Sequence, residues 1–585
     1  MDRYFILLGS IGLDSDAFER TRRELSTEGL ELRATWESVL VFVTDQTSVL
    51  NLPGGGVVIG EVYTRNGERL QEDLLAQVAP TCRDLIRHLL NECWGDYVAI
   101  RPAENAPGLS VTRSPSHACG LECLYSLRGG MGFVTSDVTL GYRLGLLERR
   151  VDFQSIACRL MFPDLKTRTT GLEGITELLP GSSLHASGRT SNVIQDWSPW
   201  SFVASPARRT ERPAAAAAVR QAVDMVVNTW AGRDRSVLLE LSGGLDSSIV
   251  GVALGAANVE VSCATLTSTA PGADELDYAA LVASAIGAPL EAIEIGFDDA
   301  KFDFAIAPRA AVPVVGPLQF AVDLLMQRHA DRVAATSIFS GAGGDTVFAY
   351  LPNAAPAADA FRARGLFTGL NTLRDLSAFH QCTWWKAARL TMRQVRQPPQ
   401  ILVELDRAFV ASHQSPSLPE PTTWLQAPAD ALQGDRLRIF GLSTALFFQQ
   451  SCPRGLSRPL RMPLLSQPVI EACLRVPGWM WFAGGHNRSV ARDAYAGRLP
   501  ETVRLRKSKG SLSGYLGALF RRRGNAMLDF LIDGELTAHG ILDADALRAY
   551  RIQPGGPISL DYMRIFRLCA VENWVRRQRA FASRY

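Results

Sequence analysis

A stretch rich in serine and glycine, Ser242-Gly243-Gly244-Leu245-Asp246-Ser247-Ser248, constrains the fold of this chain more than any other feature. It follows an apolar run at 237–241 and precedes a second apolar run at 249–254. That order predicts a strand, a tight turn and a helix. Glycines let a ligand approach the backbone closely, and the unpaired N–H groups at the helix start point back over the turn. The stretch is therefore predicted to bind an anion.

Asp246 adds a carboxylate to this turn. A carboxylate beside phosphates is favourable when a divalent cation lies between them, and Mg²⁺ is usually held by one or two carboxylates plus substrate phosphates. The lysine of the GxxxxGK[ST] phosphate loop is absent. The stretch instead resembles the SGGxDSS pyrophosphate loop of enzymes that cleave ATP between its α and β phosphates. This resemblance implies ATP and Mg²⁺ as ligands, and adenylation of a substrate rather than phosphorylation.

Strands and helices alternate after residue 213, which predicts a doubly wound parallel sheet with its ligands at the carboxyl ends of the strands. The strand at 336–339 runs into Ser340-Gly341-Ala342-Gly343-Gly344-Asp345, which resembles the SGxGxDE motif that faces the pyrophosphate loop in the same enzymes. The resemblance implies that Ser340 and Gly341 approach the nucleotide and that Asp345 joins Asp246 in holding Mg²⁺. Thr346 stands where a glutamate is usual.

The two motifs define the expected nucleotide site. Thr265, near the end of the second strand, would contact adenine through its main chain. The expected metal ligands are Asp246 and Asp345, and the expected nucleotide-binding residues are Leu241, Ser242, Gly243, Gly244, Asp246, Ser247, Thr265, Ser340 and Gly341.

A basic stretch in the C-terminal part, residues 488–510, resembles the pattern "R.A....LP..V..R.K", which lies near the end of the sequence in the same ATP-cleaving enzymes. A lysine there would stabilise charge on the acyl-adenylate and on the transition state of amine attack. Lys509, which precedes a glycine, is preferred over Lys507. The expected catalytic residues are therefore Lys509, Asp246 and Asp345.

The N-terminal part contains short alternating apolar runs and a few helical patterns, at 71–79 and 81–93 among others, which predicts a sheet-rich domain. Gly95-Asp96-Tyr97, residues 133–137 and residues 174–181 resemble landmarks of the glutamine amidotransferase domain of class B asparagine synthetases. Working members begin with a cysteine whose thiolate attacks glutamine. Here the chain begins Met1-Asp2-Arg3, so we expect no glutamine hydrolysis and a remaining role in packing or partner binding.

The expected fold class is α/β. A degenerate N-terminal Ntn-type glutaminase-like α+β domain covers 1–205, and a doubly wound parallel-sheet ATP-pyrophosphatase (asparagine synthetase-like) domain with a helical C-terminal part covers 206–585. The boundary is the proline-containing linker before an alanine-rich helix, which Pro213 suits as a first-turn residue. Residues 354–428 give weak signals and are expected to be rich in loops, with room for a peptide.

Composition excludes several classes of partner. The formal net charge of +2 over 585 residues argues against nucleic acid and a membrane surface as main partners. Ten scattered cysteines fit a reducing cytoplasm better than a disulfide framework. No apolar run reaches the roughly eighteen residues of a membrane span. A cytoplasmic protein is expected.

The resemblance implies a ligase that adenylates a carboxylate, releases pyrophosphate and lets an amine displace AMP. The missing thiolate points to an amine other than ammonia. Ser457-Arg458 and Ser466 depart from the family's "G.E.R.PFLD" stretch in the acyl-substrate pocket, which points away from free aspartate.

Relatives with both departures include the lasso-peptide macrolactam synthetases, which join an Asp or Glu side chain of a precursor peptide to that peptide's N-terminal amine. The β-lactam synthetases resemble this chain less, because they place a tyrosine at the position of Ala342. The expected function is a lasso-peptide cyclase, with a precursor peptide and a leader-peptide protease as partners. The alternatives are an ammonia-dependent asparagine synthetase, another small-molecule amide ligase and a non-catalytic scaffold.

Overall fold

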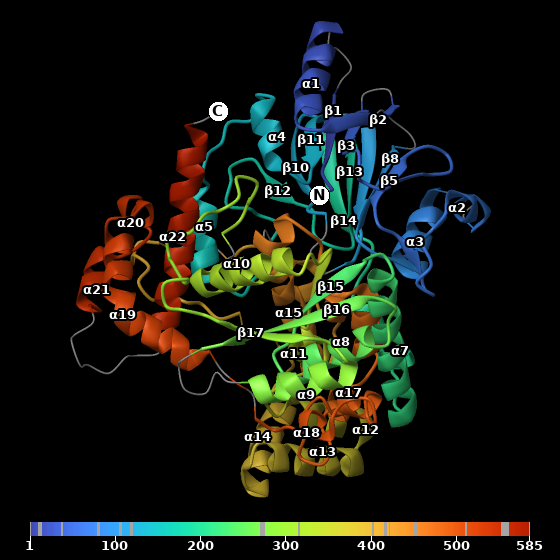
Figure 1. Ribbon diagram of the computed structural model, residues 1–585, viewed down its shortest axis with the longest axis vertical. Coiled ribbons are helices and arrows are strands. Elements are labelled where there is room, and N and C mark those ends of the chain that lie inside the picture. Colours follow the sequence, from blue (N-terminus) through green and yellow to red (C-terminus); the bar gives the residue numbers. More distant parts are fainter. Residues whose placement is uncertain are drawn as a thin grey trace.

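The computed structural model describes residues 2–9, 15–36, 39–78, 82–103, 108–116, 121–268, 275–313, 316–400, 403–414, 418–420, 422–449, 453–508, 510, 512–551 and 561–583. Two antiparallel sheets occupy the upper part of the view in Figure 1, and a parallel sheet with its helices occupies the lower part. The α/β fold class predicted from the sequence is confirmed.

The two antiparallel sheets form a sandwich. Tyr4, Ile6 and Leu8 of the first sheet share one buried apolar cluster with Val98 and Ile100 of the second, as expected where alternate side chains of each strand face inward. In order, the first sheet contains β12 (Thr176–Glu177), β10 (Leu124–Arg128), β11 (Met131–Thr135), β1 (Tyr4–Leu8), β3 (Val39–Thr44) and β2 (Leu30–Trp36). The second contains β14 (Thr190–Gln195), β13 (Ser182–Ser187), β9 (Gly108–Arg113), β8 (Tyr97–Pro102), β5 (Val57–Gly60) and β4 (Val49–Asn51).

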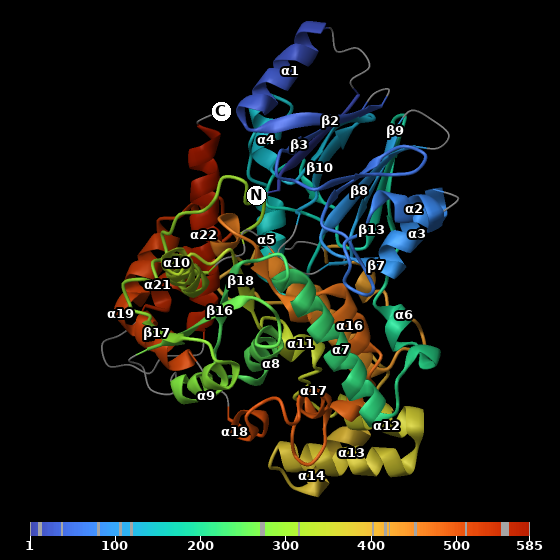
Figure 2. The ribbon, with the colours of Figure 1, turned by 45° about the vertical axis from the view of Figure 1, so that its right-hand side comes forward.

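Short helices and one small ribbon surround the sandwich. The helices predicted at 71–79 and 81–93 are present as α2 (Glu72–Val78) and α3 (Cys82–Glu92). The others are α1 (Ser15–Thr27), α4 (Val138–Arg143) and α5 (Phe153–Met161), and β6 (Tyr63–Thr64) pairs with β7 (Cys93–Trp94). Helix α6 (Trp200–Val203) lies below the sandwich and packs against residues 467–474 (Figure 2). The boundary expected at residue 205 lies in a short 3₁₀ turn, η1 (Ser205–Ala207), before α7 (Arg212–Ala231).

The parallel sheet carries the two glycine-rich motifs. Its order is β17 (Leu290–Glu294), β16 (Glu260–Thr267), β15 (Ser236–Glu240), β18 (Ser337–Ser340) and β19 (Leu460–Arg461), and every neighbouring pair is parallel. Helices α8 (Leu245–Leu254) and α9 (Leu276–Ile286) cover one face and α10 (Pro317–Arg332) covers the other (Figure 1). Glu240 pairs with Ser340 across β15 and β18, so the loops that follow these strands leave the sheet side by side.

The expectation that 354–428 would be rich in loops is wrong for its first half, which forms α12 (Ala355–Arg364), α13 (Leu366–Phe379) and α14 (Trp384–Arg396). These helices expose large apolar side chains, with Phe367 at 84% and Trp385 at 78% exposure, and such residues disturb the periodicity that identifies an amphipathic helix. The remaining α-helices are α11 (Gly344–Val347), α15 (Gln433–Ala445), α16 (Gln467–Leu474), α17 (Ser489–Ala494), α18 (Glu501–Arg504), α19 (Ser513–Ile532), α20 (Glu535–Ala538), α21 (Ala544–Ala549) and α22 (Tyr562–Ala582).

Figure 2 shows α7 and α16 running beneath the sandwich. The C-terminal helices α19 to α22 are grouped on the left of that view, beside strand β17. None of the described helices is both long enough and apolar enough to cross a membrane.

Partly buried ion pairs join the sandwich to the parallel-sheet part. Glu61 of the sandwich lies 2.7 Å from Arg233 and 3.1 Å from Arg461, and the Trp94 and Trp230 rings pack with their centroids 5.7 Å apart. Burial alone would raise the pKa of Glu61, but Arg461 and Arg233 hold that pKa below its ordinary value. The sandwich is thus fixed against the strand ends of the second part.

Glu61→Ala is expected to lower the free energy of unfolding by about 3 kcal/mol at neutral pH, because it leaves two guanidinium groups without their shared carboxylate. The folded pKa of Glu61 lies below its unfolded value, so the stabilisation is complete at neutral pH and is lost as the pH falls through the folded pKa. Urea unfolding across pH measures both effects. Glu68→Ala, at an exposed position nearby, should change stability by less than about 0.5 kcal/mol, and an equally small change for Glu61→Ala would contradict the expectation.

Candidate active site

A cavity of about 540 Å³ opens at the carboxyl ends of β15 and β18. Its walls come from the two glycine-rich loops, from residues that follow α15 and from the segment around α17 and α18. Ligands of open parallel sheets bind at this edge, where helix N-termini and loop residues converge.

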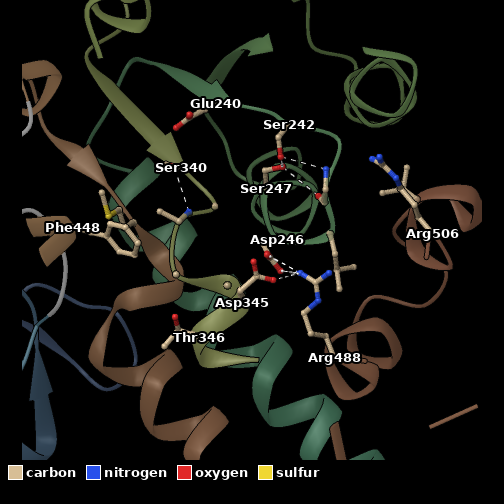
Figure 3. A pocket seen from close by; sticks show the side chains of 18 of the residues that line it. Glu240, Ser242, Asp246, Ser247, Ser340, Asp345, Thr346, Phe448, Arg488 and Arg506 are labelled. Atoms are coloured by element: carbon tan, nitrogen blue, oxygen red, sulfur yellow. Dashed lines mark hydrogen bonds and ion pairs between the residues drawn. The ribbon is translucent and has the colours of Figure 1, made fainter. Parts of the chain in front are cut away.

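Two carboxylates meet in this cavity. Asp246 lies in the first turn of α8 and Asp345 in the first turn of α11. Arg488 Nη1 donates hydrogen bonds to Asp246 Oδ1 at 3.0 Å, to Asp246 Oδ2 at 2.9 Å and to Asp345 Oδ1 at 2.8 Å (Figure 3). Both carboxylates therefore point at one positive charge.

Arg488 is held in an unusual conformation. Its φ of 51° lies in the left-handed region, which residues other than glycine adopt rarely and often at functional sites. Its side chain is 10% exposed, and its guanidinium lies 5.8 Å from the Tyr350 ring centroid. The backbone turn before α17 thus directs the guanidinium between the carboxylates.

Glycines allow the two loops to touch. A Cβ atom on Gly341 would lie 2.4 Å from the backbone nitrogen of Ser247, and a Cβ atom on Gly344 would lie 2.3 Å from Asp246 Cγ. Neither position can hold a larger residue without separating the loops. The glycine pattern of the second motif therefore brings Asp345 to Asp246.

The pyrophosphate loop is ordered by its own hydroxyl groups. Ser247 Oγ accepts a hydrogen bond from Ser242 N at 3.2 Å and lies 3.0 Å from Ser242 Oγ, and Ser248 Oγ donates to Gly244 O at 2.7 Å. The turn is thus shaped before any ligand arrives.

Three guanidinium groups, those of Arg488, Arg492 and Arg506, line the same end of the cavity. Arg506 is fixed by Glu275 at 2.9 Å and stacks over the Tyr278 ring at 3.9 Å. Burial lowers the pKa of Arg492 to about 10, so that side chain is still charged at neutral pH. These cations suit a polyanion such as the phosphates of a nucleotide.

Most of the predicted nucleotide-binding residues surround this cavity. Leu241, Gly243 and Thr265 are not part of its lining, and Thr265 is buried on β16 beside β15. The predicted residues that line the cavity are Ser242, Gly244, Asp246, Ser247, Ser340, Gly341 and Asp345.

The predicted lysine, Lys509, lies outside the described residues. Lys507 is exposed and does not contribute to the cavity lining, whereas Arg506 and Ser508 do. Sequence reasoning also missed Arg492, although its spacing of four from Arg488 at a helix start was a signal that both could face one side.

The altered acyl-pocket stretch lies mostly away from the cavity. Arg458 donates to Ala335 O at 2.7 Å and pairs with Asp331, and Ser466 Oγ donates to Pro463 O at 2.6 Å. Within residues 457–466, Met462 contributes to the lining.

The donor set fits Mg²⁺. Carboxylate oxygens plus phosphate oxygens are its usual ligands in nucleotide sites. The described part of the chain contains no group of three or more His, Cys, Asp or Glu side chains placed to hold a metal. Asp246 and Asp345 would thus share the ion with phosphate or water oxygens.

A parallel sheet with a pyrophosphate-type loop, paired carboxylates and an arginine-lined cavity defines an ATP-dependent amide-forming ligase. The family model described as asparagine synthase matches residues 218–575, so the chain belongs to the asparagine synthase family.

No curated protein matches the chain. Solved structures with some similarity include an allosteric regulatory enzyme of purine biosynthesis (12% identity, 50% of this chain and 74% of that one, TM-score 0.20). Another is the glutamine phosphoribosylpyrophosphate amidotransferase of B. subtilis, complexed with ADP and GMP (12% identity, 50% of this chain and 65% of that one, TM-score 0.21). A third is the glutamine-dependent NAD⁺ synthetase of Acinetobacter baumannii, in complex with ADP (10% identity, 66% of this chain and 84% of that one, TM-score 0.21). Likenesses this distant carry no inference about substrate.

Proposed function

We propose that the protein is an AMP-forming ligase that adenylates an Asp or Glu side chain of a precursor peptide and closes a macrolactam with that peptide's N-terminal amine, as lasso-peptide cyclases do. The convergence of Asp246 and Asp345 on one cation, in a cavity lined by arginines, carries the proposal.

The arginine-lined end of the cavity would take the phosphates of ATP. Arg488, Arg492 and Arg506 would balance the negative charge that develops on pyrophosphate as it leaves, and fixed cations in a cavity stabilise such charge without reorganisation. Mg²⁺ held by Asp246 and Asp345 would supply further charge neutralisation. The backbone at Ser340 and Gly341 would orient the α-phosphate toward the substrate carboxylate.

The cysteines described in the N-terminal part, Cys93, Cys123 and Cys158, are poor nucleophiles for glutamine. Burial raises the pKa of the Cys123 thiol to about 11, and the first described residues, Asp2 and Arg3, lead directly into β1. Arg3 N donates to Thr44 Oγ1 at 3.1 Å, so the start of the chain is tied to the sandwich. These features favour an amine that arrives with the substrate.

A peptide suits the rest of the cavity. Phe447, Phe448 and Met462 add large apolar side chains to the cavity lining. A peptide whose amine and acyl-adenylate belong to one molecule would gain much of its rate from proximity. A free N-terminal amine requires removal of any leader, so we also propose a leader-peptide protease as a partner in the same reducing, cytoplasmic compartment.

The test is incubation of the protein with ATP, Mg²⁺ and candidate core peptides. Loss of one water from the peptide by mass spectrometry, with equal amounts of pyrophosphate and AMP, is the expected result. An N-acetylated peptide should give no cyclic product. Turnover with ammonia and free aspartate alone would instead favour an asparagine synthetase.

Glutamine is not expected to replace the amine. We expect the protein to release no glutamate from glutamine, with or without ATP and a peptide, because burial raises the pKa of the described thiols Cys93, Cys123 and Cys158 and so disfavours the thiolate that would attack glutamine. Coupled glutamate detection measures this, with a known glutaminase as the positive control. Glutamate release that depends on this protein would contradict the proposed loss of glutaminase function.

A further inference from the structure

A second charged cluster lies at the end of the cavity away from Arg488. Glu240 Oε2 accepts a hydrogen bond from Arg454 Nη1 at 2.8 Å, and Arg454 Nε lies 3.0 Å from Asp323 Oδ1. Gln319 Nε2 donates to the same Asp323 oxygen at 2.6 Å. One guanidinium thus bridges two carboxylates that come from β15 and α10.

The members of this cluster differ in their access to the cavity. The side chain of Asp323 is fully buried, that of Arg454 is 5% exposed and that of Glu240 is 23% exposed. Glu240, Gln319 and Arg454 line the cavity. Asp323 does not line it and forms its ion pair with Arg454 in the protein interior. Figure 3 shows Glu240 beyond Ser340, well apart from Asp246, Asp345 and Arg488.

The charges of this cluster favour a cation. Two carboxylates around one guanidinium carry a net negative charge when both are ionised. Burial raises the pKa of Asp323 to about 6, so that carboxylate is mostly ionised at neutral pH. A protonated amine placed against Glu240 would bring the cluster to neutrality.

The cavity offers few other groups that could accept a proton. Among the described residues of its lining, the carboxylates are Glu240, Asp246 and Asp345, and there is no histidine, lysine, tyrosine or cysteine. Asp246 and Asp345 are directed at Arg488 and would hold the metal. Glu240 is the carboxylate that remains.

We propose that Glu240, positioned by Arg454, binds the protonated N-terminal amine of the peptide and accepts a proton from it. This inference rests on the proposed function and names the base for its second step. Glu240 would be a catalytic residue, and Arg454 and Asp323 would be positioning residues.

The proposed step balances as follows. An N–H bond of the ammonium group breaks, the proton moves to the Glu240 carboxylate, and the electron pair stays on nitrogen as its lone pair. That pair forms the C–N bond to the acyl carbon. The C–O bond to AMP breaks and its electron pair leaves with AMP. Glu240 releases this first proton to solvent. It then accepts the second proton, which nitrogen loses after the attack, and releases it in the same way.

Glu240→Gln separates this step from adenylation. Cyclisation by the variant is expected to fall by about a hundredfold or more, the usual contribution of a positioned base. An N-acetylated peptide with hydroxylamine, a nucleophile that is unprotonated at neutral pH, should form the peptide hydroxamate at the wild-type rate. Glu294→Gln, at an exposed position on β17 of the same sheet, should leave both rates unchanged.

The pH dependence gives an independent readout. The cyclisation deficit of Glu240→Gln should shrink as the pH rises past the ordinary pKa of an N-terminal amine, about 7.7 to 8.0, because the amine then loses its proton to solvent. If Glu240 had only a structural role, the cyclisation rates of the variant and the wild-type protein would not approach each other as the pH rises. Glu240→Asp keeps a carboxylate and should cyclise faster than Glu240→Gln.

Cyclisation at the wild-type rate by Glu240→Gln would overturn the inference. Equal loss of cyclisation and hydroxamate would also overturn it, and a raised KM for ATP with that loss would assign Glu240 to the ribose hydroxyls. Failure of the wild-type protein to form hydroxamate or pyrophosphate with any peptide would instead reject the proposed function itself.

Discussion

Asp246→Asn and Asp345→Asn are each expected to slow pyrophosphate release by about a hundredfold to a thousandfold, the effect of removing one preorganised electrostatic contact in a catalytic cavity. Each substitution keeps the size of the side chain and removes the charge that faces Arg488. Single-turnover measurement of pyrophosphate tests both. Asp277→Asn, at an exposed site on α9, is the matched control and should react at the wild-type rate.

The double variant should be little slower than either single variant, because both carboxylates would act on the same cation. Additive losses would mean that Asp246 and Asp345 act independently. Wild-type turnover in either single variant would show that the convergence seen in Figure 3 is not used in catalysis.

Arg488→Met is expected to slow pyrophosphate release by about a hundredfold and to raise the KM for ATP. The substitution leaves Asp246 and Asp345 facing each other without the guanidinium that now bridges them, and removes a cation from the phosphate end of the cavity. Initial rates at varied ATP and Mg²⁺ separate the two effects.

Arg523→Met provides the control for Arg488→Met, because Arg523 pairs with the exposed Asp298 on the surface. The control should match the wild-type protein. Tighter ATP binding and faster turnover in Arg488→Met would mean that the guanidinium competes with the metal rather than assisting the departure of pyrophosphate.

Much of the fold could be predicted because local signals agree with the tertiary structure. The apolar run before Ser242 and the glycines after it define β15, its turn and α8, and the strand predicted at 336–339 is β18, which starts and ends one residue later. In these elements an apolar run predicts the strand or helix, and a glycine-rich motif next to it predicts the turn. Helices α13 and α14 were missed because Phe367 and Trp385, which are apolar, face solvent.

The site was predictable where a motif fixes the backbone and was not where distant segments meet. Asp246 and Asp345 belong to glycine-rich loops, so their positions follow from the sequence. Arg454 and Asp323 are 131 positions apart, and nothing local to either residue signals that Arg454 contacts both Asp323 and Glu240. The left-handed backbone of Arg488 likewise depends on packing around α17.

The most direct test of the central claim is to follow oxygen from the peptide. A core peptide with heavy oxygen in both positions of its reacting side-chain carboxylate is cyclised, and the products are analysed by mass spectrometry. Activation by adenylation requires one labelled oxygen in the phosphate of AMP and the other in the new amide. Labelled inorganic phosphate, or AMP without label, would contradict the account.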